Sequence, residues 1–166
     1  MRHQGSSSTP KLECINKRLG KWRVRCDYVS EDKEKDSVSF VEKDFSHKPT
    51  IEEVKDFVLG VENAKIDERI LGGFIWKDMP VWLSSENQFN YKAAFDLAVQ
   101  TNGASLPVTF KFGTTKEPIY HEFTTVVELT DFYTQAMAHV NSVLADGWAK
   151  KDALDWSEYE RLLEES

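Results

Sequence analysis

The sequence predicts an α+β fold in which antiparallel hairpins alternate with helices. Two observations predict it. Between Gly72 and Trp148, the order strand–strand–helix occurs twice. Three segments also begin with Ser or Thr followed three positions later by Glu or Gln, which is the capping-box signature of a helix start. We expect ββα-type units packed as one layer of sheet and one layer of helices.

The length and composition fit a single folded domain with short appendages. A chain of 166 residues with 40% hydrophobic residues is large enough to bury a core. We expect a flexible polar arm at residues 1–10, one α+β domain at 11–148 and an acidic C-terminal helix at 149–166. An alternative divides the domain into an N-terminal part, 11–63, and a second part, 72–148.

The net charge of −7 argues against two classes of partner. Nucleic acids and anionic membranes both repel an acidic surface, so neither is expected. No apolar run approaches the roughly 20 residues that span a bilayer. The opening MRHQGSSSTP lacks the apolar stretch of a secretory signal, which favours an intracellular origin.

Residues 11–29 are typical of a hairpin that contains both cysteines. A three-residue loop would place Cys14 opposite Cys26, whereas a two-residue loop would pair Cys14 with Arg25. The alternation of apolar residues along the second strand favours the first register. In a reducing compartment two such thiols act as small apolar residues, so we expect no disulfide.

A charged loop at 31–36 leads to a third expected strand at 37–45. Thr50 and Glu53 form the first capping box, which predicts a helix that ends near residues 62–63. Its apolar positions have helical spacing: Ile51, Val54, Val58 and Val61. Residues 64–71 are ambiguous and could add one more helical turn, which Gly72-Gly73 would stop.

After Gly72-Gly73, a hairpin is expected around the turn Lys77–Pro80. Ser85 and Gln88 form the second capping box and start a helix that Asn102-Gly103 should end. The hairpin's apolar positions are Phe74, Trp76, Val81 and Leu83.

A second hairpin is predicted from two alternating segments, 108–112 and 119–123. Thr125 and Glu128 form the third capping box, ahead of the longest helix, which Gly147 should end. The acidic segment that follows is also expected to be helical.

The sequence contains no motif that predicts catalysis. A Gly-rich phosphate loop, a GxSxG elbow, HExxH and CxxC are all absent, so we expect no catalytic residue, no cofactor site and no enzyme activity. The alternative is a small ligand- or metal-binding module, or an enzyme, with a pocket near His121 and His139 together with Trp76 and Trp82. A metal site needs three or four ligands, so no metal is expected there.

Aromatic side chains are the best candidates for a protein interface. Trp76 and Trp82 have the same parity along their hairpin and are expected to share a face. Trp156 and Tyr159, on the acidic C-terminal segment, are expected to be exposed. The interface candidates are Trp156, Tyr159, Leu163, Trp148, Trp76 and Trp82.

Three blocks carry a family resemblance: GFIWKDMPVWLSSENQFNYKAAFDLAVQ, LPVTFKFG and YHEFTTVVELTDFYTQAMAHVNSVLADGW. The shared pattern is a GF-x-W hairpin, a polar-capped helix, a strand with a short loop, and a threonine-capped helix. Over residues 72–148 the chain resembles a domain of unknown function found in tailed-phage and prophage proteins, often tail-associated ones.

The resemblance implies a structural or assembly protein that works by protein–protein contact. Its partners would be other virion or tail proteins, or further copies of the chain. It would occupy the host cytoplasm during assembly and then the virion. A third alternative is a regulatory protein that binds a host protein.

Overall fold

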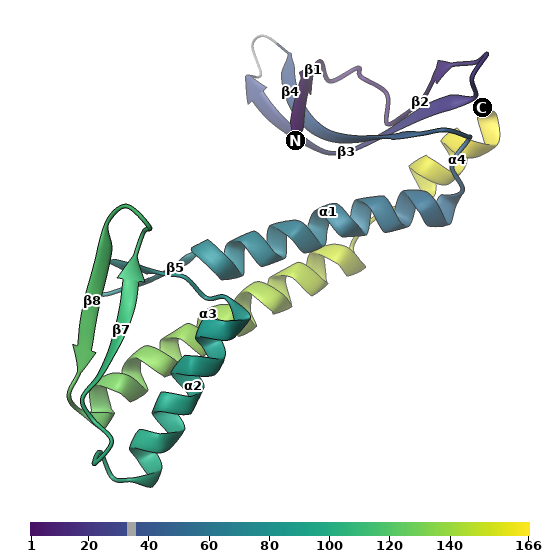
Figure 1. Cartoon of the computed structure of the whole chain (residues 1–166). Helices are drawn as coiled ribbons and strands as arrows, with labels where there is room; N and C mark the ends of the chain where they lie inside the picture. The colour runs from purple at the N-terminus through teal and green to yellow at the C-terminus, as the bar shows by residue number, and fades with distance from the viewer. Residues whose placement is uncertain (33–35) are drawn as a thin grey trace. The chain divides into compact units, whose positions relative to one another are not determined.

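The structure is a computed structural model and describes residues 1–32 and 36–166. By its contacts the chain divides into two compact units, shown in Figure 1. The N-terminal unit comprises residues 1–63 and 150–166, and the central unit comprises residues 64–149. The α+β class is confirmed by helices and antiparallel strands in the described part of the chain.

The N-terminal unit contains an antiparallel sheet with strand order β1-β4-β3-β2. Residues 2–5, expected within a flexible arm, instead form the edge strand β1 because they pair with β4, with Arg2 opposite Val41. The predicted third strand is confirmed at 37–45, whereas the charged loop expected at 31–36 lies partly outside the described residues. The strands are β1 (Arg2–Gly5), β2 (Leu12–Asn16), β3 (Lys21–Asp32) and β4 (Ser37–Phe45).

The β2–β3 hairpin has neither of the two predicted registers. Cys14 lies opposite Trp22, and Cys26 lies opposite Val41 on β4. The loop is longer than either prediction assumed, and Gly20 closes it at a φ of 62° that favours glycine. Both cysteines remain thiols, because this register separates them along β3.

Helix α1 (Ile51–Gly72) begins at the predicted capping box. The backbone N–H of Thr50 donates to Glu53 Oε2 at 2.8 Å, and the N–H of Glu53 donates to Thr50 Oγ1 at 3.3 Å. The helix continues through the ambiguous segment 64–71 and ends at Gly72, because Ile66 and Ile70 provide further buried or half-buried positions. At the other end of the chain, the expected acidic helix is α4 (Ser157–Glu165).

The central unit contains two separate hairpins and parts of three helices. Its strands belong to two two-stranded sheets, β5-β6 and β7-β8, so the strands of the described chain do not form the single layer that we expected. Figure 1 shows the β7–β8 hairpin and α2 beside the first half of α3. The elements are β5 (Phe74–Trp76), β6 (Met79–Val81), α2 (Ser85–Gln100), β7 (Val108–Gly113), β8 (Pro118–Phe123) and α3 (Val126–Asp152).

The β5–β6 turn is tighter than predicted. Lys77 and Asp78 both have positive φ angles, 47° and 63°, which is the type I′ geometry of a two-residue hairpin loop. Trp76 therefore pairs with Met79. Counting through this turn places Trp82 on the face opposite Trp76, so the predicted shared face is wrong.

Two of the other helix boundaries differ from the prediction. The N-cap of α2 is Ser84, whose Oγ accepts the N–H of Asn87 at 3.2 Å, and not Ser85. Thr125 caps α3 as predicted, by accepting the N–H of Glu128 at 3.2 Å. Helix α3 passes through Gly147 because that residue is packed against Ile66.

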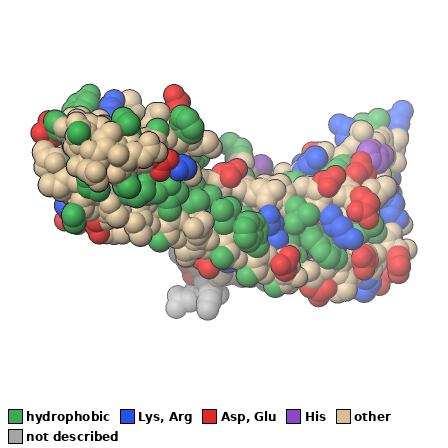
Figure 2. All heavy atoms as spheres, turned by 90° about the horizontal axis from the view of Figure 1, so that it is seen from below, with side chains coloured by type: hydrophobic (Ala, Val, Ile, Leu, Met, Phe, Trp, Pro, Cys, Tyr) green, Lys and Arg blue, Asp and Glu red, His purple; other side chains and the backbone are tan. Residues whose placement is uncertain are grey.

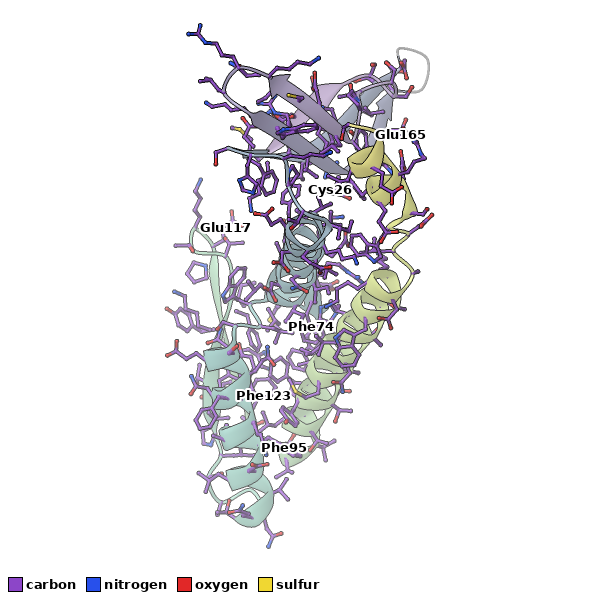
Figure 3. All side chains as sticks on the ribbon, turned by 90° about the vertical axis from the view of Figure 1, so that its right-hand side faces the viewer. Cys26, Phe74, Phe95, Glu117, Phe123 and Glu165 are labelled. Atoms are coloured by element: carbon purple, nitrogen blue, oxygen red, sulfur yellow. The ribbon has the colours of Figure 1, made fainter. Side chains whose placement is uncertain are left out.

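An aromatic core fills the central unit. Phe132 of α3 lies within 5.3 Å, centroid to centroid, of both Trp76 and Phe123. Phe123 and Phe95 lie between α2 and α3 in Figure 3. The fully or nearly buried members are Phe74, Trp76, Val81, Leu83, Tyr91, Ala98, Phe112, Phe123, Leu129, Phe132, Ala136 and Val140.

Two helical glycines should respond to alanine in opposite ways. At Gly147 a Cβ would lie 2.3 Å from Ile66 Cδ1, whereas at Gly60 nothing lies within 4 Å. We expect Gly147→Ala to lower the free energy of unfolding by about 1–2 kcal/mol through overpacking. Gly60→Ala should raise it by about 1 kcal/mol through helix propensity. Urea denaturation followed by circular dichroism measures both, and a stabilising Gly147→Ala would contradict the close packing at Ile66.

Candidate functional site

A pocket of about 530 Å³ lies in the central unit between β6 and β7. One wall is Pro80–Trp82, at the end of β6, and the other is Lys111–Thr115, at the end of β7. Gly72 and Asn87 complete the lining. The two walls come from consecutive residues, so backbone as well as side chains borders the pocket.

The two strands that border this pocket are neighbours without being paired. β6 contacts β7, yet each belongs to a different sheet in the described chain. The edge of each strand that faces the pocket therefore carries backbone groups that are not used in a ladder between them. Open strand edges of this kind can pair with an added strand.

Trp82 is the main aromatic group of the pocket. Its side chain is 54% exposed, and its six-membered ring lies beside Gly72, 3.9 Å from where a Cβ would stand. The amide Nδ2 of Asn87 donates to the backbone oxygen of Trp82 at 2.8 Å and fixes the chain there. Phe112, which is buried, lies on the opposite wall.

Lys111 is the charged member of the described pocket lining. Its ammonium group makes no ion pair with any residue that the structure describes. Thr114 Oγ1 accepts the N–H of Glu117 at 3.0 Å, which shapes the loop beside the pocket. The site thus combines an exposed indole, an available cation and hydroxyl groups.

Apolar side chains continue outside the pocket. Ile75 is paired with Pro80 on the outer face of the β5–β6 hairpin and is 62% exposed. Phe89, on the first turn and a half of α2, is 71% exposed. We call Ile75, Pro80, Trp82 and Phe89 the Trp82 surface. Figure 2 shows exposed hydrophobic side chains grouped among charged ones on the face it presents.

The two histidines of the alternative site have separate partners. His121 Nε2 lies 3.2 Å from Glu128 Oε1, and its ring contacts Trp76 edge-on at 5.1 Å. His139 Nε2 lies 3.0 Å from the backbone oxygen of Arg69. In the described chain no three His, Cys, Asp or Glu side chains are placed to hold a metal ion. Of the four residues named for this alternative, Trp82 lines the pocket between β6 and β7.

A polar cluster fastens the β5–β6 hairpin to α3. Lys77 Nζ donates to Glu128 Oε1 at 2.7 Å and lies 4.4 Å from the centroid of the Trp76 ring. Trp76 Nε1 donates to Asp131 Oδ2 at 3.0 Å. The hydrogen bond from Lys77 holds the pKa of Glu128 below its ordinary value of 4.5.

This cluster should make stability depend on pH. Because the pKa of Glu128 is lowered by folding, its stabilising contribution is present above pH 4.5 and is lost as pH falls through the folded-state pKa. We expect Glu128→Gln to be less stable at pH 7, with a difference from wild type that shrinks below pH 4.5. Urea midpoints across that range measure it, and a constant difference at all pH values would contradict the assignment.

A comparison with known protein families matches the part of the chain that contains the pocket. Residues 53–165, more than half of the chain, match a domain of unknown function, DUF4376. The chain belongs to the DUF4376 family. Neither the curated proteins nor the solved structures contain a match to it. The expected membership in a domain family of unknown function is thus confirmed, and DUF4376 includes the whole pocket lining.

The other predicted interface residues are divided between core and surface in this DUF4376 chain. Tyr159 is buried because its hydroxyl donates to the backbone oxygen of Arg25 at 2.7 Å, so its predicted exposure is wrong. Trp156 and Leu163 are half-buried against the same N-terminal core. Trp76 is only 1% exposed, whereas Trp148 is exposed. No helix within residues 1–32 and 36–166 has the length and apolar character to cross a membrane.

Sequence reasoning missed most of the pocket. Lys111 and Thr115 carry no local signal, because only the meeting of β6 with β7 brings them near Trp82. Asn87 reaches Trp82 locally, from the start of α2 five residues along the chain. Gly113 indicated only the turn that ends β7 beside the pocket. It has a φ of 79° at the end of β7, where a Cβ would lie 2.3 Å from the backbone oxygen of Glu117.

Proposed function

We propose that this DUF4376 protein is a structural or assembly protein associated with the tail of a tailed bacteriophage. It acts by protein–protein contact and not by catalysis. Its partners are other virion or tail proteins, or further copies of the chain. It works in the host cytoplasm during assembly and then in the virion.

The observation that carries a binding role is the Trp82 surface. Neighbouring Trp, Phe and Ile side chains that stay exposed on a folded unit commonly mark an interaction site. Here the hairpin's inner face supplies Trp76 to the core while its outer face presents Ile75 and Trp82. The tail association rests on the sequence resemblance over residues 72–148.

The proposal is tested in the bacterium that carries the gene. The prophage is induced in the parent strain and in a gene deletion, and infectious particles are counted per encapsidated genome. We expect the deletion to lower this ratio and a plasmid copy to restore it. An antibody against the chain should detect it in tail fractions or in assembly intermediates.

A surface variant provides the matched comparison. Plasmid copies carrying Ile75→Ser with Trp82→Ser should restore the ratio poorly, whereas Val127→Ser should restore it fully. Val127 is also a highly exposed apolar residue, but it lies on α3 and outside the Trp82 surface. An unchanged infectious ratio in the deletion, with no chain in any particle or intermediate, would refute a tail role.

A further inference from the structure

We propose that the pocket between β6 and β7 binds an extended peptide segment of a partner protein, with an apolar side chain beside Trp82 and a carboxylate on Lys111. This inference rests on the proposed function, because it names the site through which a partner would be held. An Asp or Glu side chain or a chain-terminal carboxylate would supply the negative charge.

The first step is the apolar anchor. The pocket places the half-exposed ring of Trp82 opposite Phe112, with Val81 and Pro80 along the same wall. A buried aromatic contact of this kind commonly supplies much of the binding energy of a protein interface. The volume of about 530 Å³ suits one or two side chains rather than a whole helix.

The second step is the backbone. Both long walls are strand ends, Pro80–Trp82 and Lys111–Gly113, and the structure shows no ladder between β6 and β7 in the described chain. A peptide that adds to a strand edge gains main-chain hydrogen bonds, and its alternate side chains enter adjoining pockets. Pro80 has no N–H, so the β7 edge is the better template.

The third step is charge. Lys111 is the single charged residue in the described lining, and it makes no ion pair with a described residue. Tyr120, its cross-strand neighbour on β8, is exposed. Glu122 is diagonal to Lys111 on the same face of the hairpin but makes no ion pair with it, and no described acid lines the pocket. The lining therefore presents one positive charge, which favours a carboxylate in the occupant.

An acidic sugar is the competing occupant, because a pyranose ring can also stack on an exposed indole. The strand edges favour the peptide, since a sugar makes no use of a repeating row of backbone donors and acceptors. The experiment includes both ligands.

A displayed library of random dodecapeptides is selected on the full-length protein and counter-selected on a Trp82→Ala, Lys111→Glu double variant. We expect the enriched peptides to share an apolar residue close to Asp or Glu. By titration calorimetry, the best peptide should bind at least tenfold more weakly to each single variant. Val127→Ser should bind it as wild type does.

A charge exchange makes the test specific. Replacing the peptide's acid by lysine should abolish binding to wild type and restore it to Lys111→Glu. Circular dichroism and melting temperatures confirm that each variant is folded, as expected for exposed positions. In labelled protein, the peptide should shift backbone resonances of Val81, Trp82 and Lys111–Thr115.

Three outcomes would overturn the inference. One is the absence of peptides that distinguish wild type from the double variant. Another is equal binding to wild type and both single variants. The third is saturable binding of D-glucuronate at this pocket without any peptide binding. If the gene deletion lowers infectious yield while the pocket variants bind and complement normally, the proposed function stands and this inference fails.

Discussion

Replacing Trp76 with alanine should destabilise the central unit by about 3–5 kcal/mol. The indole is 1% exposed, so the substitution leaves a large cavity in the middle of the aromatic core. Its ring lies 5.3 Å from both Phe123 and Phe132, and these contacts are lost together. The indole N–H also no longer satisfies Asp131.

Trp82→Ala is the matched control, because it removes the same side chain from the same hairpin. Trp82 is half-exposed and borders a pocket rather than the core, so we expect a loss of about 1 kcal/mol or less. Urea denaturation monitored by circular dichroism compares the two. Equal losses would contradict the opposite-face assignment that follows from the two-residue turn.

Sequence alone predicted the parts of the fold that depend on local chemistry. The capping box at Thr50 and Glu53 is present because both of its hydrogen bonds join residues three apart. The apolar stripe of α3, including Leu129 and Phe132, follows from helical spacing and is buried as expected. The antiparallel hairpins likewise followed from alternation and short turns.

The errors in the hairpins arise at their turns, because the turn sets which residues of the two strands pair and which share a face. At Lys77-Asp78, two non-glycine residues adopt positive φ angles, and no sequence rule selected that tight turn over a four-residue one. Both turns contain an even number of residues, so residues of equal parity on the two strands lie on opposite faces in either case. The predicted shared face of Trp76 and Trp82 was wrong because it carried the alternation straight through the turn. The four-residue loop before Lys21 displaced the predicted pairing of Cys14.

The terminal segments show how tertiary contacts override local composition. The polar leader was expected to be flexible, but Arg2 donates to the backbone oxygen of Ser39 at 2.9 Å and its strand pairs with β4. The acidic tail was expected to present Tyr159, but that ring packs with Val24 and Cys26. The interface prediction therefore moves from the tail to the Trp82 surface.

The pocket was predictable only in part, for a geometric reason. Trp82 was predicted as an interface candidate because tryptophan is a frequent anchor of protein interfaces, whatever its neighbours are. Lys111 was not, because its importance depends on lying across from Trp82, and the two residues are joined by α2 and a loop in the chain. Contacts between unpaired strands leave no periodic signal in either segment.

The second large effect is expected at Arg25 in the N-terminal unit. The residue is only 6% exposed, although its guanidinium carries a charge. It donates to Glu42 and Glu13 at 2.9 Å each, and to the backbone oxygen of Pro10 at 2.9 Å. Arg25, on β3, therefore links this strand to β4 through Glu42 and to β2 through Glu13. Its bond to Pro10 also holds the segment that leads into β2.

Arg25→Met should lower the free energy of unfolding by about 3 kcal/mol. Methionine retains the apolar stem, but it leaves the largely buried carboxylate of Glu42 with its weaker contacts to Arg23, at 3.2 Å, and to His3, at 3.7 Å. Adding Glu42→Gln should recover part of the loss, because the unmatched charge is then removed as well. Urea denaturation of the two single variants and the double variant measures this coupling.

Arg23→Met serves as the control for removing an arginine from the same strand. Arg23 pairs with Asp44 at 2.6 Å and more weakly with Glu42 at 3.2 Å. The Arg23 and Asp44 side chains are more exposed than those of Arg25 and Glu42. A solvent-exposed ion pair contributes about 1 kcal/mol or less, so the variant should stay close to wild type. Equal losses for Arg23→Met and Arg25→Met, or no recovery in the double variant, would show that burial of the Arg25 ion pairs does not determine the stability of this sheet.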